Sequence, residues 1–393
     1  MNNQKPNIYS NTTIKIPNYQ ITETVYSGSR TRVYRGIRTD DKLPVVIKVM
    51  KRQYPTFTEL VQFRNQYTIA KNLEIPAIIQ LYNLEPYQNG YALVMEDFGG
   101  ISLQEFLQEK LLTLEQFFPI AIQLADILQQ LHQHGVIHKD IKPANILIHP
   151  QTKQVKLIDF SIASLLPRET QEIQNPNVLE GTLAYISPEQ TGRMNRGIDY
   201  RSDYYSLGVT FFEMLTNHLP FHSDDPMELV HCHIAKASLL VHEIDSEIPC
   251  VLSKIVNKLM AKNAEDRYQS AWGLKHDLET CLSELQETGK ISDFEIGQQD
   301  VSDRFLIPDK LYGRETEVET LLEAFERVSN PPQTPLSKEI IPPQSPLGKE
   351  TIPPQSPHPT KSAASSGFPH SKKKAAFGPK VRTNERLIKK YCN

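Results

Sequence analysis

The chain has few cysteines, no long apolar run and no large excess of one charge. Its cysteines, Cys232, Cys250, Cys281 and Cys392, lie far apart and match neither a disulfide framework nor a zinc site. No run approaches the roughly 18 apolar residues of a membrane span, and the polar N-terminal stretch does not resemble a secretory signal. The net charge of −3 argues against a dedicated nucleic-acid binder. We therefore expect a cytoplasmic protein with reduced thiols.

The composition changes sharply after Asn330. Up to that point it is ordinary for a globular protein, but 12 of the 28 prolines follow, and a Pro-Pro-Gln motif recurs every 11 residues from Pro331. Such a segment cannot bury a continuous apolar face. We expect residues 331–393 to be disordered, and a docking role for their P-x-x-P segments in the extended PPII form stays open.

One loop concentrates the residues that suggest chemistry. It reads His-Lys-Asp-Ile-Lys-Pro-Ala-Asn over residues 138–145 and lies between an amphipathic run and the apolar residues 146–148. Thirteen residues after Ile146, Asp159 follows a second apolar run, residues 155–158. Carboxylate and amide oxygens suit Mg²⁺, and a lysine beside an aspartate suits a reaction on a charged phosphate.

This order of residues resembles the catalytic core of protein kinases, in which H-R-D-x-x-x-x-N is followed by D-F-G. Here the motifs read H-K-D-x-x-x-x-N and D-F-S. The resemblance implies an α+β, bilobal fold, with a β-rich N-lobe that carries one helix and a larger helical C-lobe. It assigns catalysis to Asp140 and Lys142, and the binding of Mg²⁺ to Asn145 and Asp159. ATP is the implied phosphate donor.

Two further motifs extend the resemblance toward the N-terminus. Residues 45–48 read Val-Val-Ile-Lys, similar to the family's V-A-I-K, so Lys48 is expected to pair with the ATP phosphates. Aligned on Val33, the glycine-rich loop keeps only its middle glycine, Gly28, with Tyr26 and Thr31 at the outer positions. A plain hairpin turn is the alternative reading of this loop.

The resemblance also implies the remaining ATP contacts. Met95 is expected to flank the adenine, and the main chain of Glu96 to Phe98 to hydrogen-bond its edge, before Gly99-Gly100 marks the change of lobe. The full set of expected ATP-binding residues is Lys48, Gly28, Val33, Tyr26, Met95, Glu96, Phe98 and Gln66.

Gln66 is the clearest departure from the family. Apolar residues at spacings of three and four predict a helix over 57–73, on which kinases place a glutamate that holds the ATP-binding lysine. Glutamine can hydrogen-bond Lys48, but it cannot make the charge-assisted pair that a glutamate makes with the lysine, which is typically about twice as strong. With Lys139 and Ser161, this departure supports an alternative function, an ATP-binding pseudokinase that acts as a regulatory module.

The C-lobe motifs imply scaffold and specificity roles. A long helix over 114–134 is expected, with His132 and His134 as exposed helix-end residues. Asp203 is expected to hold the backbone of the catalytic loop, and Arg267 to pair with Glu189. The segment around Thr182 favours Ser/Thr over Tyr specificity.

The expected organisation has five parts: a disordered lead over 1–18, a kinase domain over 19–285 (N-lobe 19–97, C-lobe 98–285), a linker over 286–310, the start of an ATPase module over 311–329, and the tail over 331–393. The segments 192–196 and 311–315 are similar to large bacterial sensors that fuse a Ser/Thr kinase to an ATPase module and a histidine kinase. No G-x-x-x-x-G-K-[ST] follows, so we expect a truncated descendant of such a protein.

The sequence thus favours a bacterial signalling enzyme that transfers the ATP γ-phosphate to Ser and Thr hydroxyls. Protein substrates are the expected partners, and autophosphorylation stays open. Neither nucleic acid nor a membrane span is expected.

Overall fold

The computed structural model describes residues 15–109, 111–165, 168–169, 182–194 and 196–301. The chain divides into a unit over Met1–Glu315 and a second over Thr316–Asn393, and every described residue belongs to the first. The expected ATPase-like start over 311–329 and the proline-rich tail lie outside the described residues, as does most of the lead.

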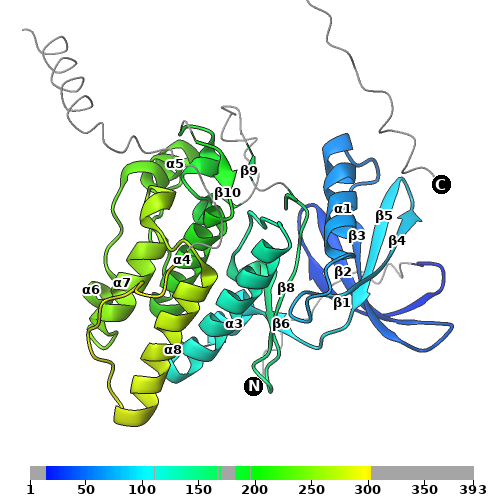
Figure 1. Cartoon of the computed structure of the whole chain (residues 1–393). Helices are drawn as coiled ribbons and strands as arrows, with labels where there is room; N and C mark the ends of the chain where they lie inside the picture. The colour runs from blue at the N-terminus through cyan, green and yellow to red at the C-terminus, as the bar shows by residue number, and fades with distance from the viewer. Residues whose placement is uncertain (1–14, 110, 166–167, 170–181, 195, 302–393) are drawn as a thin grey trace, which may run out of the picture. The chain divides into compact units, whose positions relative to one another are not determined.

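The N-terminal lobe is a five-stranded antiparallel sheet with one helix (Figure 1). The strands lie in the order β1-β2-β3-β5-β4. Their bounds are β1 Tyr19–Ser27, β2 Thr31–Arg38, β3 Pro44–Met50, β4 Leu81–Tyr87 and β5 Gly90–Glu96. Helix α1 spans Phe57–Ala70. It starts at a capping box, in which Thr56 Oγ1 accepts from Glu59 N and the Glu59 carboxylate accepts from Thr56 N at 2.8 Å.

Alternation along β3 decides which side chains enter the core. Val45, Ile47 and Val49 are buried and pack with Ala92 and Val94 of β5 in one cluster. Because successive side chains of a strand point to opposite faces, Lys48 is directed to the other face of the sheet.

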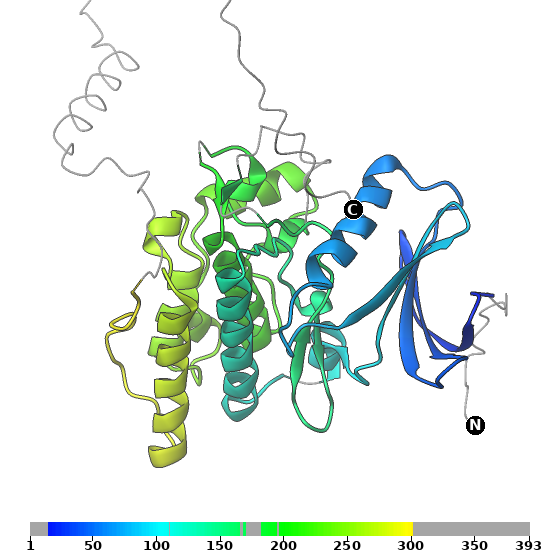
Figure 2. The same cartoon turned by 45° about the vertical axis from the view of Figure 1, so that its right-hand side comes forward.

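The C-terminal lobe is mainly helical, and α3 and α8 lie side by side in it (Figures 1 and 2). Helix α4 runs through the lobe with nearly all of its side chains buried. The helices are α2 Leu103–Glu109, α3 Leu114–Gln133, α4 Arg201–Thr216, α5 Pro226–Ala235, α6 Val241–Ile244, α7 Cys250–Leu259 and α8 Ala271–Thr288. This arrangement confirms the predicted α+β kinase fold.

Short elements connect the helices and carry the loop at residues 138–145. A three-stranded sheet in the order β6-β7-β8 follows the first lobe. Its strands and the remaining short elements are β6 Ile101–Ser102, η1 Pro143–Asn145, β7 Ile146–Ile148, β8 Val155–Leu157, β9 Arg168–Glu169, η3 Leu183–Tyr185, η4 Glu189–Thr191, β10 Ile198–Asp199 and η5 Ala264–Asp266. Because β7 and β8 are an antiparallel pair, the residues before β7 and those after β8 lie at the same end of the hairpin.

Residues 289–301 pack on the C-lobe, although the sequence predicts a polar linker over 286–310. Helix α8 continues to Thr288 and ends at Gly289, which has a φ of +70°. Ile291, Phe294 and Ile296 then pack against the main core. These three apolar side chains, together with the hydrogen bonds that the Asp300 carboxylate accepts from Gln269 N and Ser270 N, hold the stretch against the lobe.

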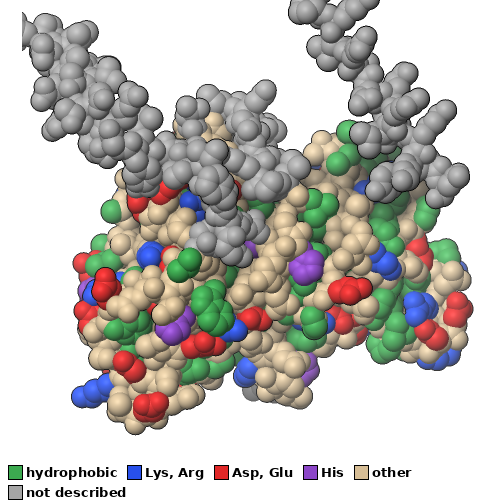
Figure 3. Space-filling view, in the orientation of Figure 1, with side chains coloured by type: hydrophobic (Ala, Val, Ile, Leu, Met, Phe, Trp, Pro, Cys, Tyr) green, Lys and Arg blue, Asp and Glu red, His purple; other side chains and the backbone are tan. Residues whose placement is uncertain are grey.

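In the portion of the chain that the structure covers, no helix combines the length and the apolar character needed to cross a bilayer. On the face shown in Figure 3, acidic and basic side chains are interspersed. That face presents no continuous stripe of one charge.

Candidate active site

Asp203, at the start of α4, organises the loop that precedes the predicted catalytic residues. Its carboxylate is fully buried and accepts hydrogen bonds from His138 N at 2.9 Å and Lys139 N at 2.8 Å. His132 Nε2 lies 3.0 Å from the same carboxylate. The expected hold of Asp203 on the loop backbone is therefore present. The prediction of an exposed His132 is wrong, because the ring is buried against this carboxylate, whereas His134 is exposed.

The predicted catalytic residues form one hydrogen-bonded group. Lys142 Nζ lies 2.6 Å from Asp140 Oδ2, and Asn145 Nδ2 donates to the same oxygen at 2.8 Å. Thr182 donates to Asp140 Oδ1 through both its N–H and its hydroxyl, each at 3.2 Å, and Lys142 also contacts the Thr182 hydroxyl. Asp140 is thus held by donors on both carboxylate oxygens, which fixes the orientation of its side chain.

Lys48 joins the N-lobe to the segment after β8. Its ammonium group donates to Asp159 Oδ2 at 2.9 Å and to Gln66 Oε1 at 3.1 Å. Gln66 is only 2% exposed. The structure therefore places Gln66 of α1 against Lys48 of β3, as the family alignment implies, and the amide oxygen stands where the family has a carboxylate.

The electrostatics of Asp159 suit a cation site. Burial raises the pKa of this carboxyl, but the charge and the hydrogen bond of Lys48 outweigh it and lower the pKa to about 2. Its Oδ1 atom is buried and has no hydrogen-bond partner among the described residues. A buried, ionised oxygen without a donor is a fitting ligand for Mg²⁺.

Asn145, the second predicted metal ligand, is tied to the chain that leads to Asp159. Its amide nitrogen donates two hydrogen bonds to Asp140, one to the carboxylate and one to the main-chain carbonyl at 2.9 Å. The amide oxygen is therefore the Asn145 side-chain atom that could bind a cation. The Asn145 carbonyl accepts from Ile158 N at 2.9 Å, so the loop is tied to the residue before Asp159. The two predicted metal ligands thus fit Mg²⁺ by chemistry and by connection.

The predicted ATP-binding residues of the sheet form a row across three strands. Tyr26 of β1 is paired with Val33 of β2, and Val33 with Lys48 of β3. At the β1–β2 connection, Gly28 N donates to the Thr31 carbonyl at 3.0 Å. A side chain at Gly28 would collide with the Tyr26 ring, whose Oη would lie 2.4 Å from the added Cβ. The connection is a hairpin turn, and its glycine permits this close approach.

In the segment between the lobes, one main-chain group that the sequence assigns to adenine binding already has a hydrogen-bond partner. Met95 is buried at the end of β5, and Phe98 lies beyond it with Lys156 Nζ 5.3 Å from its ring centroid. Glu96 N donates to the Gln80 carbonyl at 2.9 Å, and the Glu96 side chain pairs with Lys156. The Glu96 N–H is therefore already engaged, and an adenine edge would have to meet other main-chain groups of residues 96–98.

Comparison with known proteins agrees with this geometry. The sequence pattern of the family described as "Protein kinase domain" matches residues 19–278. The chain belongs to the protein kinase family. The predicted membership of the Ser/Thr kinase class is confirmed at the level of the family, because similar proteins are named as serine/threonine-protein kinases.

Three relatives illustrate the similarity. PrkC of Bacillus subtilis is 30% identical over 67% of this chain and 40% of its own length, and PknB of Mycobacterium tuberculosis is 30% identical over 66% and 42%. Hybrid signal transduction histidine kinase G of Dictyostelium discoideum is 34% identical over 55% of this chain and 9% of its own length. The kinase chain thus spans about two-fifths, or less, of these relatives.

The kinase uses one active-site contact that sequence reasoning missed. Asn65 Nδ2 donates to the Ser161 and Ala163 carbonyls at 3.1 and 3.0 Å, and so ties α1 to the segment after Asp159. No motif marks this residue. The only available signal is its position next to Gln66, on the helix that is expected to carry the partner of Lys48.

A second missed cluster lies at the hinge of the kinase. Arg35 of β2 pairs with Asp97 at 2.6 Å and with Glu23 of β1. The side chains are partly exposed, so solvent weakens the attraction. The cluster joins the first two strands to the segment between the lobes.

The expected scaffold pair of the kinase is present. Arg267 donates to both carboxylate oxygens of Glu189, at 2.7 and 2.8 Å, and both side chains are almost completely buried. Burial raises the pKa of the Glu189 carboxyl, but Arg267 outweighs it, so the net pKa is lowered. The Ser202 hydroxyl adds a third bond at 2.6 Å, so the pair fastens η4 to α4 and η5.

Proposed function

We propose that this protein transfers the γ-phosphate of Mg-ATP to Ser and Thr hydroxyls of proteins. The observation that carries the proposal is the connected group of Asp140, Lys142 and Asn145, tied through Ile158 to the Asp159–Lys48 pair. Phosphoryl transfer depends mainly on positioning and on charge neutralisation, and these groups supply both. The contact of Thr182 with Asp140 supports Ser/Thr specificity.

Each residue has a defined task in this mechanism. Asp140 orients the acceptor hydroxyl and takes its proton, because Thr182, Lys142 and Asn145 fix the carboxylate. Lys142 offsets the charge that develops on the transferred group. Lys48 faces the ATP phosphates from the N-lobe. Mg²⁺, held by Asp159 and Asn145, would neutralise phosphate oxygens.

The test compares substitutions that keep shape and remove charge. Asp140→Asn and Asp159→Asn should each abolish transfer of labelled phosphate from ATP to a protein substrate, while far-UV circular dichroism stays unchanged. The matched control is Asp224→Asn, an exposed position with the same chemical change. Transfer at the wild-type rate in both active-site variants would refute the proposal.

A pseudokinase remains the second candidate, and one observation favours it. Gln66 gives Lys48 a neutral partner, so the only carboxylate that the structure shows on Lys48, among the described residues, is that of Asp159. Such a protein would bind Mg-ATP without turning it over. ATP binding by calorimetry, with no Asp140-dependent transfer, identifies this case.

We further propose that the kinase descends from a signalling fusion. The identity with a hybrid histidine kinase and the ATPase-like residues 311–315 support this descent. Protein substrates, autophosphorylation and a cytoplasmic location belong to the same proposal. Mass spectrometry of phosphorylated Ser and Thr residues, before and after incubation with ATP, tests the autophosphorylation.

A further inference from the structure

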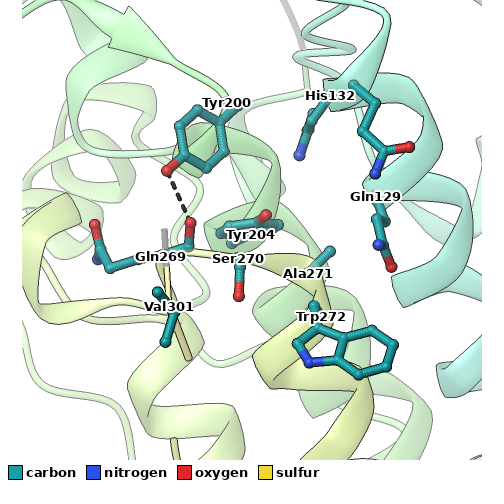
Figure 4. A pocket seen from close by; sticks show the side chains of 10 residues that line it. Gln129, His132, Tyr200, Tyr204, Gln269, Ser270, Ala271, Trp272 and Val301 are labelled. Atoms are coloured by element: carbon teal, nitrogen blue, oxygen red, sulfur yellow. Dashed lines mark hydrogen bonds between the residues drawn. The ribbon is translucent and has the colours of Figure 1, made fainter. Parts of the chain in front are cut away.

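A cavity of about 240 Å³ lies in the C-lobe, away from the predicted ATP site. Figure 4 shows its walls, which come from α3, from the start of α4 and from the start of α8. The lining includes the aromatic rings of Tyr200, Tyr204 and Trp272, the His132 ring, and the amides of Gln129, Gln133 and Gln269. These walls pair apolar surface with neutral hydrogen-bonding groups. That combination suits an uncharged peptide segment, whose side chains need apolar contacts and whose main chain needs donors and acceptors.

The rim of the cavity exposes apolar surface. Trp272 is 53% exposed and Val301 is 73% exposed, although both line the cavity. Large exposed apolar side chains gathered at one concave site indicate a surface that another segment covers. The question is which segment does so.

The last described residues of the chain, 297–301, are anchored beside this cavity. The Asp300 carboxylate accepts from Gln269 N, Ser270 N and the Ser270 hydroxyl at 2.8–3.0 Å, and it pairs with Lys258. Gly297 N donates to Asp277 at 2.8 Å. These bonds hold the last described residues against the start of α8, so the following residues begin at the rim of the cavity.

The residues that follow Val301 include an apolar stretch that matches the apolar walls of the cavity. After the polar Ser-Asp-Arg of 302–304 come Phe305, Leu306 and Ile307, and then Pro308. An extended chain advances about 3.3 Å per residue, so Phe305 can reach about 13 Å from Val301. Trp272 lies only two residues beyond Ser270, to which Asp300 is bonded. The apolar triplet is therefore within reach of the cavity.

We propose that Phe305-Leu306-Ile307 docks into this cavity and covers Trp272. The site is an intramolecular docking site for an apolar segment of the same chain. Its walls include Tyr204, which follows Asp203 on α4, and His132 of α3, which contacts the Asp203 carboxylate. The docked segment thus rests on two neighbours of Asp203, whose carboxylate holds the catalytic-loop backbone. Docking requires neither ATP nor phosphate transfer, so its failure would leave the proposed enzymatic activity untouched.

The test uses the fact that Trp272 is the only tryptophan of the chain. In the full-length protein, its emission and its quenching by acrylamide report directly on whether the cavity is covered. Replacing all three triplet residues by serine should shift the emission to longer wavelength and raise the quenching constant about twofold. The reason is that the Trp272 ring, about half exposed without the docked triplet, would no longer be covered. The matched control replaces Leu321, Leu322 and Phe325 by serine and should change neither quantity.

A reciprocal measurement keeps the test valid if the serine variant is unstable. In the unchanged protein, amide hydrogen exchange at Leu306 and Ile307 should be slowed about tenfold or more relative to a free peptide. Trp272→Ala should remove this protection. Equal quenching in the wild type and the triplet variant would overturn the proposal, as would unprotected amides in the wild type. Protection that disappears on dilution would overturn it too, since a second copy would then be the occupant.

Discussion

The contact between Gln66 and Lys48 allows a direct test of how the kinase positions Lys48, the lysine predicted to bind ATP. We expect Gln66→Glu to raise the rate of phosphate transfer. Lys48 Nζ lies 3.1 Å from Gln66 Oε1 and 2.9 Å from Asp159 Oδ2, so a carboxylate at position 66 would form an ion pair with Lys48 without any rearrangement. Replacing the neutral amide acceptor by a carboxylate should strengthen the bond that the ammonium group already makes by on the order of 1 kcal/mol.

The magnitude depends on two opposing effects. Each 1.4 kcal/mol delivered to the transition state is about a tenfold change in rate, so we expect an increase of up to about tenfold. Against this, position 66 is 2% exposed, and burying a carboxylate costs several kcal/mol before its partner compensates. The new charge also shares Lys48 with Asp159, which reduces the gain. Both effects can be measured in the same variant.

The assay measures kcat, KM for ATP and melting temperature on a fixed protein substrate. Three variants are compared: Gln66→Glu, Gln66→Met, which removes the bond, and Gln62→Glu, which adds the same charge one helical turn away. We expect kcat to rise in the first, to fall in the second and to stay constant in the third. Unchanged kcat in stable forms of both position-66 variants would refute the role of this contact. A lower melting temperature in Gln66→Glu alone would show that the buried carboxylate is not compensated.

Three further predictions concern stability and the tail. Burial lowers the pKa of His233 from its usual 6.5 to about 4. Between these two pH values the imidazole is protonated in the unfolded chain and neutral in the folded one. The resulting stability is complete above pH 6.5 and is lost as the pH falls toward 4. Urea unfolding at pH 7 and pH 5 should show a loss of about 2 kcal/mol that His233→Gln removes and the exposed His134→Gln does not. Arg267→Met should lower the free energy of unfolding by about 3–5 kcal/mol in the same experiment, because it leaves the buried Glu189 carboxylate without its partner. The double variant Arg267→Met/Glu189→Gln should recover part of this loss. Equal stability of the single and the double variant would contradict the argument. A chain that ends at Asn330 should keep its melting temperature and its rate, since the composition of the proline repeats predicts that they bury no apolar face, and a loss of either would show that the tail contributes.

Much of the catalytic loop could be predicted from the sequence because its residues are close together along the chain. Asp140, Lys142 and Asn145 occupy one short loop, and their close spacing puts them within reach of one another. The Val-Val-Ile-Lys motif likewise marked Lys48, and alternation along β3 places it on the face opposite to that on which Ile47 packs. Local geometry decides both features, and local geometry can be read from the order of residues.

Other features were decided only by the tertiary structure. His132 lies on an amphipathic helix, and the periodicity of that helix indicated its apolar face but not the buried carboxylate of Asp203, 71 residues later, that receives the ring. Asn65 meets carbonyls 96 and 98 residues away, and residues 289–301 are held by Asp300 and three apolar side chains. The physical reason is the same in each case. A polar group is buried only where a distant segment supplies its partner, and the sequence around that group does not specify which segment arrives.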